Sequence, residues 1–429
     1  MVTRETCTGI NRHLFNLKTY IDSIFHYVPH LIKGELSLID YFKLLYRMSI
    51  YAGTLNNNKF VKVNGKMRLG LYVSAYGTKP YWITNDKLFN FKNMMPPSTV
   101  VISITSACRN KCEHCYQKND KGQDINIDEM IKAVQKIQEM GVPFCIIEGG
   151  DTFLVYERLK KLVSSIDDRS EIWVNTTGDE VTLERMMELK KMGISAVRFS
   201  LHHHDPAVFN QFMGVDWAWD NLIKGTTICN EVGVPVVFNA CINKEGFYNG
   251  DFEKIMDKAR ELNGVIIEVI HPKRAGGWLS QEIEQFSEKD FDRVKSLVYQ
   301  YNFNPEYKDY PMISCQIIEE SVSMYGCSAG GVERFYINAK GDVQPCEFLN
   351  ISFGNIEKEE FETIYKRMRE QFMPPCETWL CDKYCTEIYK VARKNNVTVL
   401  PLGEELSKQV YMKWDRGTPT RLYEKLYFK

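Results

Sequence analysis

The segment ACRNKCEHCYQ places three thiols within eight residues, directly after the apolar stretch TVVISIT. These are Cys108, Cys112 and Cys115, in the pattern C-x3-C-x2-C. Thiolates bind zinc or iron–sulfur clusters. A structural zinc ion takes four ligands, whereas three cysteines on a four-iron cluster leave one iron open to another molecule. His114 or His13 could complete a zinc site, but the spacing favours a 4Fe–4S cluster, with zinc or no metal as the alternative.

Five further cysteines gather near the carboxyl end of the chain. The pattern C-x13-G-x4-C is followed by CETWLCDKYC, so the candidate ligands are Cys327, Cys346, Cys376, Cys381 and Cys385. Stable disulfides are rare in a reducing compartment, and this grouping suits metal binding better than cross-linking. A zinc knuckle could hold the same thiolates. The other cysteines are expected to be buried free thiols (Cys7, Cys145, Cys229 and Cys241) or a minor ligand candidate (Cys315).

The bulk composition limits the class of protein. The 429 residues are 44% hydrophobic and 12% aromatic, which provides for a sizeable core and more than one domain. The formal net charge of −1 argues against a nucleic-acid-binding protein. Neither a signal peptide nor a run of about 18 apolar residues is evident. We therefore expect a cytoplasmic protein without a transmembrane segment.

The cysteine loop follows the first strand of a strand–helix alternation. Six apolar strands alternate with helices between residues 99 and 272, which predicts a parallel sheet with right-handed crossovers. Six repeats fall short of the eight in a full barrel, so the expected fold is α/β, a partial (β/α)6 TIM barrel. Ligands should gather at the carboxyl ends of its strands.

The remaining segments suggest additions to this barrel. Two amphipathic helices, the first ending at Pro29 and the second at Gly53, precede a hairpin at Asn64-Gly65. We expect their apolar faces (Leu14–Ile21–Phe25 and Leu38–Phe42–Leu45) to pack on the barrel; peripheral contact with a membrane or an apolar substrate is the alternative. The expected domains are a helical and hairpin region (1–95), the barrel (96–310), a small cysteine-rich domain (311–395) and a helical or irregular tail (396–429).

The segment CRNKCEHCY resembles the C-x3-C-x-φ-C signature of the radical S-adenosylmethionine (SAM) superfamily. The resemblance implies a 4Fe–4S cluster on the three cysteines, with its open iron chelated by SAM. It further implies reductive cleavage of SAM to a 5′-deoxyadenosyl radical that abstracts hydrogen from a peptide or small-molecule substrate, with electrons from a flavodoxin- or ferredoxin-type donor. His114 occupies the φ position, which in this family usually contacts adenine.

Later strand ends resemble the same family. EGGD is similar to its glycine-rich GGE motif, whose backbone receives the SAM amino group, and VNTTG is similar to its TNG strand end. Ser200 and Asn239 match the fourth and fifth strands. The implied cofactor-binding residues are His114, Glu148, Gly149, Gly150, Asp151, Asn175, Ser200 and Asn239. Substrate-binding residues would come from the barrel mouth, where Glu268, His271, Lys273 and Arg274 are expected to be exposed; no catalytic acid or base is evident.

The second cysteine group resembles the SPASM and twitch extensions of radical SAM enzymes, and FGNI follows its C-x13-G-x4-C hairpin as it commonly does there. A full SPASM domain has seven cysteines for two auxiliary clusters, but its C-x2-C pair is missing here. The resemblance implies one auxiliary 4Fe–4S cluster on Cys327, Cys346, Cys381 and Cys385, with Cys376 as a rival ligand. Two other functions stay open: a zinc-binding structural or regulatory protein, and a maturase acting on a partner protein.

Overall fold

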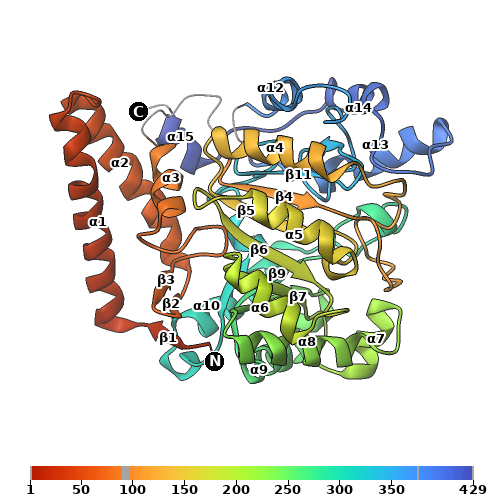
Figure 1. The fold of residues 1–429 in the computed structure, drawn as a ribbon, viewed down its shortest axis with the longest axis horizontal. Helices are drawn as coiled ribbons and strands as arrows, with labels where there is room; N and C mark the ends of the chain where they lie inside the picture. The colour runs from red at the N-terminus through yellow and green to blue at the C-terminus, as the bar shows by residue number, and fades with distance from the viewer. Residues whose placement is uncertain (1, 89–95, 374–375, 428–429) are drawn as a thin grey trace.

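A nine-stranded sheet forms the centre of the computed structural model, which describes residues 2–88, 96–373 and 376–427 (Figure 1). Its order is β10-β9-β8-β7-β6-β5-β4-β11-β12, and all neighbouring strands are parallel except β11 and β12. The strands are β4 (Thr99–Ser103), β5 (Phe144–Glu148), β6 (Glu171–Thr176), β7 (Ala196–Ser200), β8 (Val236–Cys241), β9 (Gly264–Ile270), β10 (Met312–Cys315), β11 (Arg334–Ile337) and β12 (Val343–Gln344).

Helices cover the outer face of this sheet, as Figure 1 shows for α4 to α9. They are α4 (Ile127–Glu139), α5 (Tyr156–Ser165), α6 (Leu183–Lys191), α7 (Pro206–Met213), α8 (Ala218–Val232), α9 (Asp251–Glu261) and α10 (Glu288–Phe303). Side-chain caps define several starts: Asn126 accepts a hydrogen bond at the first turn of α4, and Ser287 forms a capping box with Asp290 on α10. The predicted partial barrel with six strand–helix repeats is confirmed.

The sheet extends beyond the six predicted strands at both edges. β10 pairs with β9, and β11 pairs in parallel with β4. Both strands follow the expected boundary at residue 310, yet they belong to the barrel sheet. The chain turns between β11 and β12 at Lys340-Gly341, with Gly341 at φ 88°. Strands of four residues have too little periodicity to reveal a partner far away in the sequence.

The amino-terminal region closes the barrel at the start of its strands. It contains β1 (Arg4–Cys7), α1 (Gly9–Ile32), α2 (Leu38–Thr54), β2 (Phe60–Val63), β3 (Lys66–Arg68) and α3 (Lys79–Asp86). β1, which the sequence did not predict, pairs with β2 in a three-stranded antiparallel sheet. Val61, Val63 and Leu71 pack with the inward-facing side chains of the barrel strands. The hairpin at Asn64-Gly65 is confirmed, with φ of 47° and 81°. The expected domain boundary at residues 95 and 96 falls partly outside the described residues.

Two expectations about the amino-terminal helices were wrong. Helix α1 continues through Pro29 to Ile32, where the Lys33 N–H donates to the Pro29 carbonyl at 3.0 Å. Proline removes the hydrogen bond to the carbonyl of Phe25, but Phe25 is on the solvent side, where water can satisfy that carbonyl. The apolar faces also do not pack on the barrel: Leu14, Ile21 and Phe25 are 57%, 42% and 70% exposed.

The carboxyl-terminal part contains α11 (Gln316–Glu319), α12 (Phe361–Gln371), α13 (Leu380–Lys394), α14 (Glu404–Tyr411) and α15 (Arg421–Tyr427). The expected helical or irregular tail is helical in α14 and α15, and α15 lies against α2. Among the described residues, no helix has the length and apolar content that a membrane crossing requires.

Glu319 gives the fold a pH dependence. It is half-buried at the end of α11 and accepts a hydrogen bond from Ser314 Oγ at 2.7 Å; loss of contact with water raises its pKa to about 7. Because the folded state holds this proton more tightly, its contribution to stability is present below the ordinary pKa of 4.5 and is lost as pH rises through 7. The free energy of unfolding of Glu319→Gln should therefore gain about 2 kcal/mol on the parent between pH 5 and 8, measured by anaerobic urea unfolding. Glu282→Gln, an exposed control, should show no such trend.

Candidate functional site: a cavity between two cysteine groups

The carboxyl ends of β4 to β9 surround a cavity of about 190 Å³. The cysteine loop after β4 forms one wall, and residues from the carboxyl-terminal domain, Glu347 and Phe348, form another. Most of the residues that the sequence singled out line this cavity: Cys108, Cys112, His114, Cys115, Glu148, Gly149, Gly150, Asn175, Ser200 and Asn239.

The three thiols of the loop lie close enough together to influence one another. Burial, together with the neighbouring charges of Cys115 and Cys108, raises the pKa of Cys112 to about 12. The pKa of Cys108 is likewise raised to about 12, chiefly by burial. Cys112 Sγ also lies 3.3 Å from the carbonyl of Met213, at the end of α7. Thiols that resist ionisation in this way become thiolates when a metal centre binds them, so the donor set fits a cluster.

The paired glycines bring the end of β5 against the backbone of the cysteine loop. The Gly150 N–H donates to the Thr105 carbonyl and the Asp151 N–H donates to the Ala107 carbonyl, both at 2.7 Å. A Cβ atom on Gly150 would lie 2.1 Å from the Ala107 carbonyl oxygen. Glycine at this position therefore allows the cysteine loop to pack closely against the end of β5. From the sequence we expected the glycines to allow a close approach of SAM instead.

The Asp151 carboxylate does not line the cavity. It is 1% exposed and accepts hydrogen bonds from the Thr176 hydroxyl at 2.9 Å, the Thr177 N–H at 3.0 Å and the Phe153 N–H at 3.1 Å. These bonds tie the end of β6 to the loop after β5. The structure thus places Asp151 as a residue that positions two cavity walls.

An aromatic cluster surrounds His114. Its ring stacks on Phe212 with centroids 4.1 Å apart, and Trp278 and His202 contact its other sides. Burial lowers the pKa of His114 to about 4, so the imidazole is neutral at neutral pH, and its buried Nδ1 has no hydrogen-bond partner. A neutral, flat, partly unsatisfied ring suits contact with an adenine.

Arg198 is a site residue that sequence reasoning missed. It lies in the middle of β7, where its guanidinium donates to Glu268 at 2.5 Å and to Asn175 Oδ1 at 3.1 Å, and lies 3.8 Å from Glu148. Tyr72 donates to Glu268 from the amino-terminal region, and Tyr116 donates to Glu148. An arginine inside the apolar stretch AVRFSLH was the available signal, because a charge in a buried strand needs buried partners.

Of the remaining strand-end residues, some have their polar atoms in hydrogen bonds and others do not. The Asn175 amide donates to Glu148 at 2.8 Å, whereas Asn239 Oδ1 is buried without a partner. Burial raises the pKa of Glu148 to about 7, against the lowering effect of Arg198. Open polar atoms on a cavity wall fit a polar ligand such as SAM, since unsatisfied buried groups are otherwise costly.

Three expected mouth residues are buried. Glu268, His271 and Lys273 line the cavity beneath the carboxyl-terminal domain, whereas Arg274 points away and donates to Thr386 at 3.0 Å. The Lys273 ammonium lies 2.8 Å from Asp382 and 3.6 Å above the ring centre of Trp379. The sequence could not show this, because α13 covers the barrel mouth from more than a hundred residues away.

The cysteines of the second group converge near this cover. Cys327 donates its N–H to the Cys376 carbonyl at 2.9 Å, and burial raises the pKa of both thiols. The pKa of Cys381 is raised by burial and by the charges of Cys346 and Cys327. Cys385 is buried one turn after Cys381 on α13. The charge that shifts the pKa of Cys315 is that of Glu319 and not that of another cysteine. Cys315 is therefore not a member of this cysteine group.

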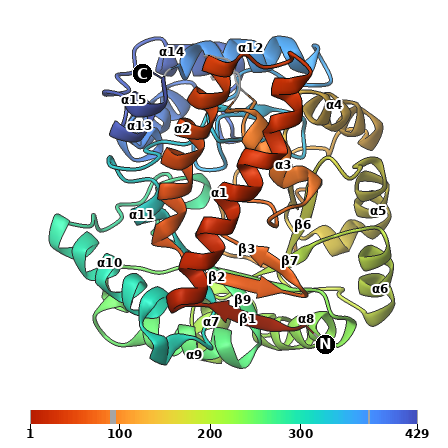
Figure 2. The same cartoon turned by 90° about the vertical axis from the view of Figure 1, so that its left-hand side faces the viewer.

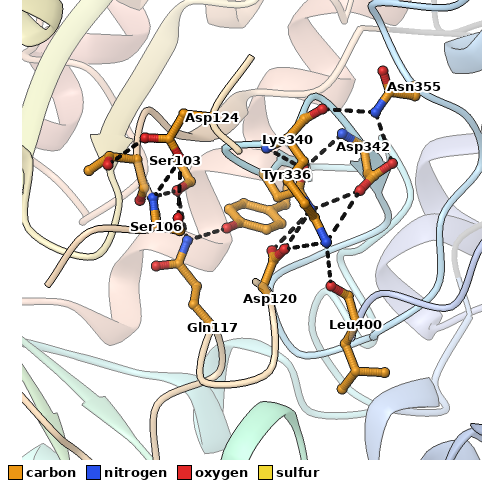
Figure 3. A network of polar contacts seen from close by, with 12 residues as sticks. Ser103, Ser106, Gln117, Asp120, Asp124, Tyr336, Lys340, Asp342, Asn355 and Leu400 are labelled. Atoms are coloured by element: carbon orange, nitrogen blue, oxygen red, sulfur yellow. Dashed lines mark hydrogen bonds and ion pairs between the residues drawn. The ribbon is translucent and has the colours of Figure 1, made fainter. Parts of the chain in front are cut away.

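A polar network fixes the carboxyl-terminal domain to the cysteine loop (Figure 3). Gln117 donates to Ser103 at 2.7 Å and to Tyr336 at 2.6 Å, and Asp120 binds Lys340 at 2.8 Å. Gln117 and Asp120 follow the loop directly, whereas Tyr336 and Lys340 belong to the β11–β12 hairpin. The network therefore sets the spacing between the two cysteine groups.

Comparison with known proteins accounts for both groups. Residues 102–259 match the model of the radical SAM superfamily, and residues 327–386 match the SPASM model, an iron–sulfur cluster-binding domain. The chain is a radical SAM enzyme with a SPASM domain. The family's cofactors are SAM and 4Fe–4S clusters, which the open polar atoms and the thiols described above fit.

This radical SAM enzyme is similar to several curated proteins and solved structures. An AdoMet-dependent heme synthase of Nitratidesulfovibrio vulgaris is 22% identical over 285 residues, covering 62% of this chain and 77% of the relative. An Fe-coproporphyrin III synthase of Methanosarcina barkeri is 22% identical over 301 residues, covering 64% and 75%. Among solved structures, Streptococcus suis SuiB bound to its precursor peptide SuiA has a TM-score of 0.52 at 19% identity, covering 66% and 68%. Native anSMEcpe with bound AdoMet and Cp18Cys peptide has a TM-score of 0.51 at 14% identity, covering 78% and 96%.

Proposed function

We propose that this enzyme abstracts a hydrogen atom from a peptide substrate in the cavity between the two cysteine groups. When bound, SAM and a 4Fe–4S cluster supply reductive cleavage to a 5′-deoxyadenosyl radical. The observation that carries the proposal is the position of the cavity: its walls combine the three-cysteine loop, open polar atoms of the strand ends, and residues of the SPASM domain.

Each wall has a proposed part in binding. Cys108, Cys112 and Cys115 hold the cluster, and His114 within its aromatic cluster contacts the adenine. The open Asn239 Oδ1 and the Ser200 hydroxyl meet polar groups of SAM. Glu148, Gly149, Gly150, Asp151 and Asn175 keep these groups in position through the loop contacts and the Arg198 network.

Glu148 is the proposed proton acceptor of the cavity. Its pKa of about 7 allows it to exchange a proton near neutral pH, and Tyr116 and Asn175 hold its carboxylate at the cavity wall. Oxidation of a substrate carbon after hydrogen abstraction releases a proton, and Glu148 is placed to receive it.

One auxiliary 4Fe–4S cluster is proposed for the SPASM domain. Cys327, Cys346 and Cys381 are electrostatically coupled, and Cys385 completes the set from the next turn of α13, with Cys376 as the rival fourth ligand. The auxiliary cluster would lie beside the cavity, where it could accept an electron from the substrate. A flavodoxin- or ferredoxin-type protein is the proposed donor to the first cluster, and a cytoplasmic location is proposed.

The fourth ligand can be identified with two single variants. We expect Cys385→Ser to lose about half of the iron of the two-cluster protein, whereas Cys376→Ser should keep it, because Cys385 shares a helix face with Cys381. Iron analysis and electron paramagnetic resonance after anaerobic reconstitution measure this. If Cys376→Ser loses iron and Cys385→Ser retains all of it, then Cys376 is the fourth ligand and Cys385 is not.

A peptide is favoured over a tetrapyrrole by the charge of the cavity. Glu148, Glu268 and Glu347 line it, and of its two cations Arg198 is held by carboxylates of the cavity wall and Lys273 by Asp382. The acidic residues of the cavity would repel a tetrapyrrole with several carboxylates. They would not repel a peptide with neutral or basic side chains. The relatives named as heme and coproporphyrin synthases make the tetrapyrrole the second candidate.

The substrate class is tested by stimulation of SAM cleavage. The reduced enzyme should form 5′-deoxyadenosine faster with members of a basic or neutral peptide library than without substrate, and the stimulating peptide should change in mass. Fe-coproporphyrin III should leave the rate unchanged. Stimulation by the porphyrin alone would overturn the peptide proposal, and formation of product only on a protein partner would favour a maturase.

A further inference from the structure

The outer faces of α1 and α2 form an exposed apolar surface, here called the helical platform. On α1 its members are Ile10, Leu14, Leu17, Ile21, Ile24 and Phe25, whose exposed fractions run from 40% to 74%. On α2 they are Leu38, Ile39, Phe42 and Tyr46, exposed by 46% to 68%. Figure 2 shows both helices side by side in front of the rest of the molecule, and no other described element lies over them. Single exposed apolar residues are ordinary, but a continuous surface of this size marks an interaction site.

The spacing on α1 is that of a helix–helix seam. Ile10, Leu14, Leu17, Ile21 and Ile24 follow intervals of four, three, four and three residues, whereas Val28 and Leu31 at the next two positions are half-buried against the cluster that contains Tyr27. This is the heptad pattern in which one helix packs its side chains between those of another. The inner face of α1, with Thr19, Ser23 and Tyr27, is already buried against the protein, so the seam points outward.

The charges beside the platform do not suit a lipid surface. Helices that lie on anionic membranes carry rows of lysine and arginine next to their apolar face. Here Lys18 is paired with Asp22 in the same helix, and His30 lies 2.7 Å from Glu35. The rim is therefore mixed in sign, which is typical of a surface that meets another protein.

The area matches that of a stable dimer. Ten large side chains exposed to this extent offer on the order of 1,000 Å² of surface. Two such surfaces together give about 2,000 Å², at the upper end of the range of specific interfaces, and a two-helix surface facing its own copy forms a four-helix bundle. We propose that the helical platform binds the platform of a second copy of this chain around a two-fold axis.

This pairing leaves the catalytic cavity accessible. The platform belongs to the region that closes the amino-terminal end of the barrel, whereas the cavity is at the carboxyl ends of the strands (Figure 1). The dimer thus has two independent sites, and its loss should not change SAM cleavage.

Sedimentation velocity of the full-length, reconstituted enzyme tests the proposal. The parent should sediment as a dimer at micromolar concentration. Leu17→Lys combined with Ile21→Lys should weaken association by on the order of 100-fold, because two charges would be buried in the seam without partners. Phe42→Lys on α2 is an independent second variant. The matched control is Val322→Lys with Met412→Lys, which changes two apolar residues that are 61% and 68% exposed elsewhere and should leave the dimer intact.

The contrary outcomes are distinct. A parent that is monomeric up to about 50 μM, or a double variant that remains dimeric, overturns the proposal. Co-sedimentation of a monomeric parent with phosphatidylcholine vesicles, lost in the double variant, would assign the platform to a lipid surface and overturn it as well. Unchanged 5′-deoxyadenosine formation in all variants shows that they fold and separates this result from the proposed function.

Discussion

Replacing Cys108, Cys112 and Cys115 together with alanine should abolish reductive cleavage of SAM and leave about half of the iron. The expected content is roughly eight iron atoms per parent chain and roughly four in the triple variant, because the SPASM cysteines lie in a different segment of the chain, residues 327–386, and keep their own ligands. Iron and sulfide analysis, with 5′-deoxyadenosine detection by mass spectrometry, measures both quantities.

A single replacement of Cys7 serves as the control, since this thiol lies in β1 and far from both groups in the fold. It should keep all iron and full cleavage. Persistent 5′-deoxyadenosine formation in the triple variant would remove the loop from the catalytic site, and a parent with roughly twelve iron atoms would mean a second auxiliary cluster.

Gly150→Ala should reduce SAM cleavage by at least about 100-fold, since displacement of a catalytic loop by about 1 Å has effects of that size. The new methyl group would lie 2.1 Å from the Ala107 carbonyl oxygen, so the backbone that leads into Cys108 must move. We expect the spectrum of the loop cluster and the SAM dissociation constant to change together. Residual iron should not fall below that of the triple cysteine variant.

Gly53→Ala is the matched control, because Gly53 lies within α2 and a Cβ atom there meets nothing within 4 Å. It should leave cleavage and iron content unaltered. A Gly150→Ala enzyme with normal iron and normal SAM affinity would show that the loop adapts without cost.

Local patterns predicted the parts of the site that depend on neighbouring residues. The spacing of the three loop cysteines, the alternation of strands and helices, and the glycines after β5 each belong to one short segment. Strand ends in a parallel sheet meet at one edge, and the resemblance to the radical SAM superfamily singled out Asn175, Ser200 and Asn239 at that edge, where they line the cavity.

Contacts between distant segments could not be predicted in the same way. Arg198 depends on Glu268 and on Tyr72 from the amino-terminal region, and the burial of His271 and Lys273 depends on α13. The sequence of EGGD also does not show that the Asp151 side chain turns to the end of β6. The apolar faces of α1 and α2 predict burial, but no described segment of the same chain provides it.

The most direct test of radical SAM activity is anaerobic incubation of the reconstituted enzyme with SAM and dithionite. The site predicts 5′-deoxyadenosine and methionine in equal amounts, formed only when reductant is present, from a brown protein that absorbs at about 400 nm. A fully iron-loaded enzyme that binds SAM and forms no 5′-deoxyadenosine under these conditions would contradict it.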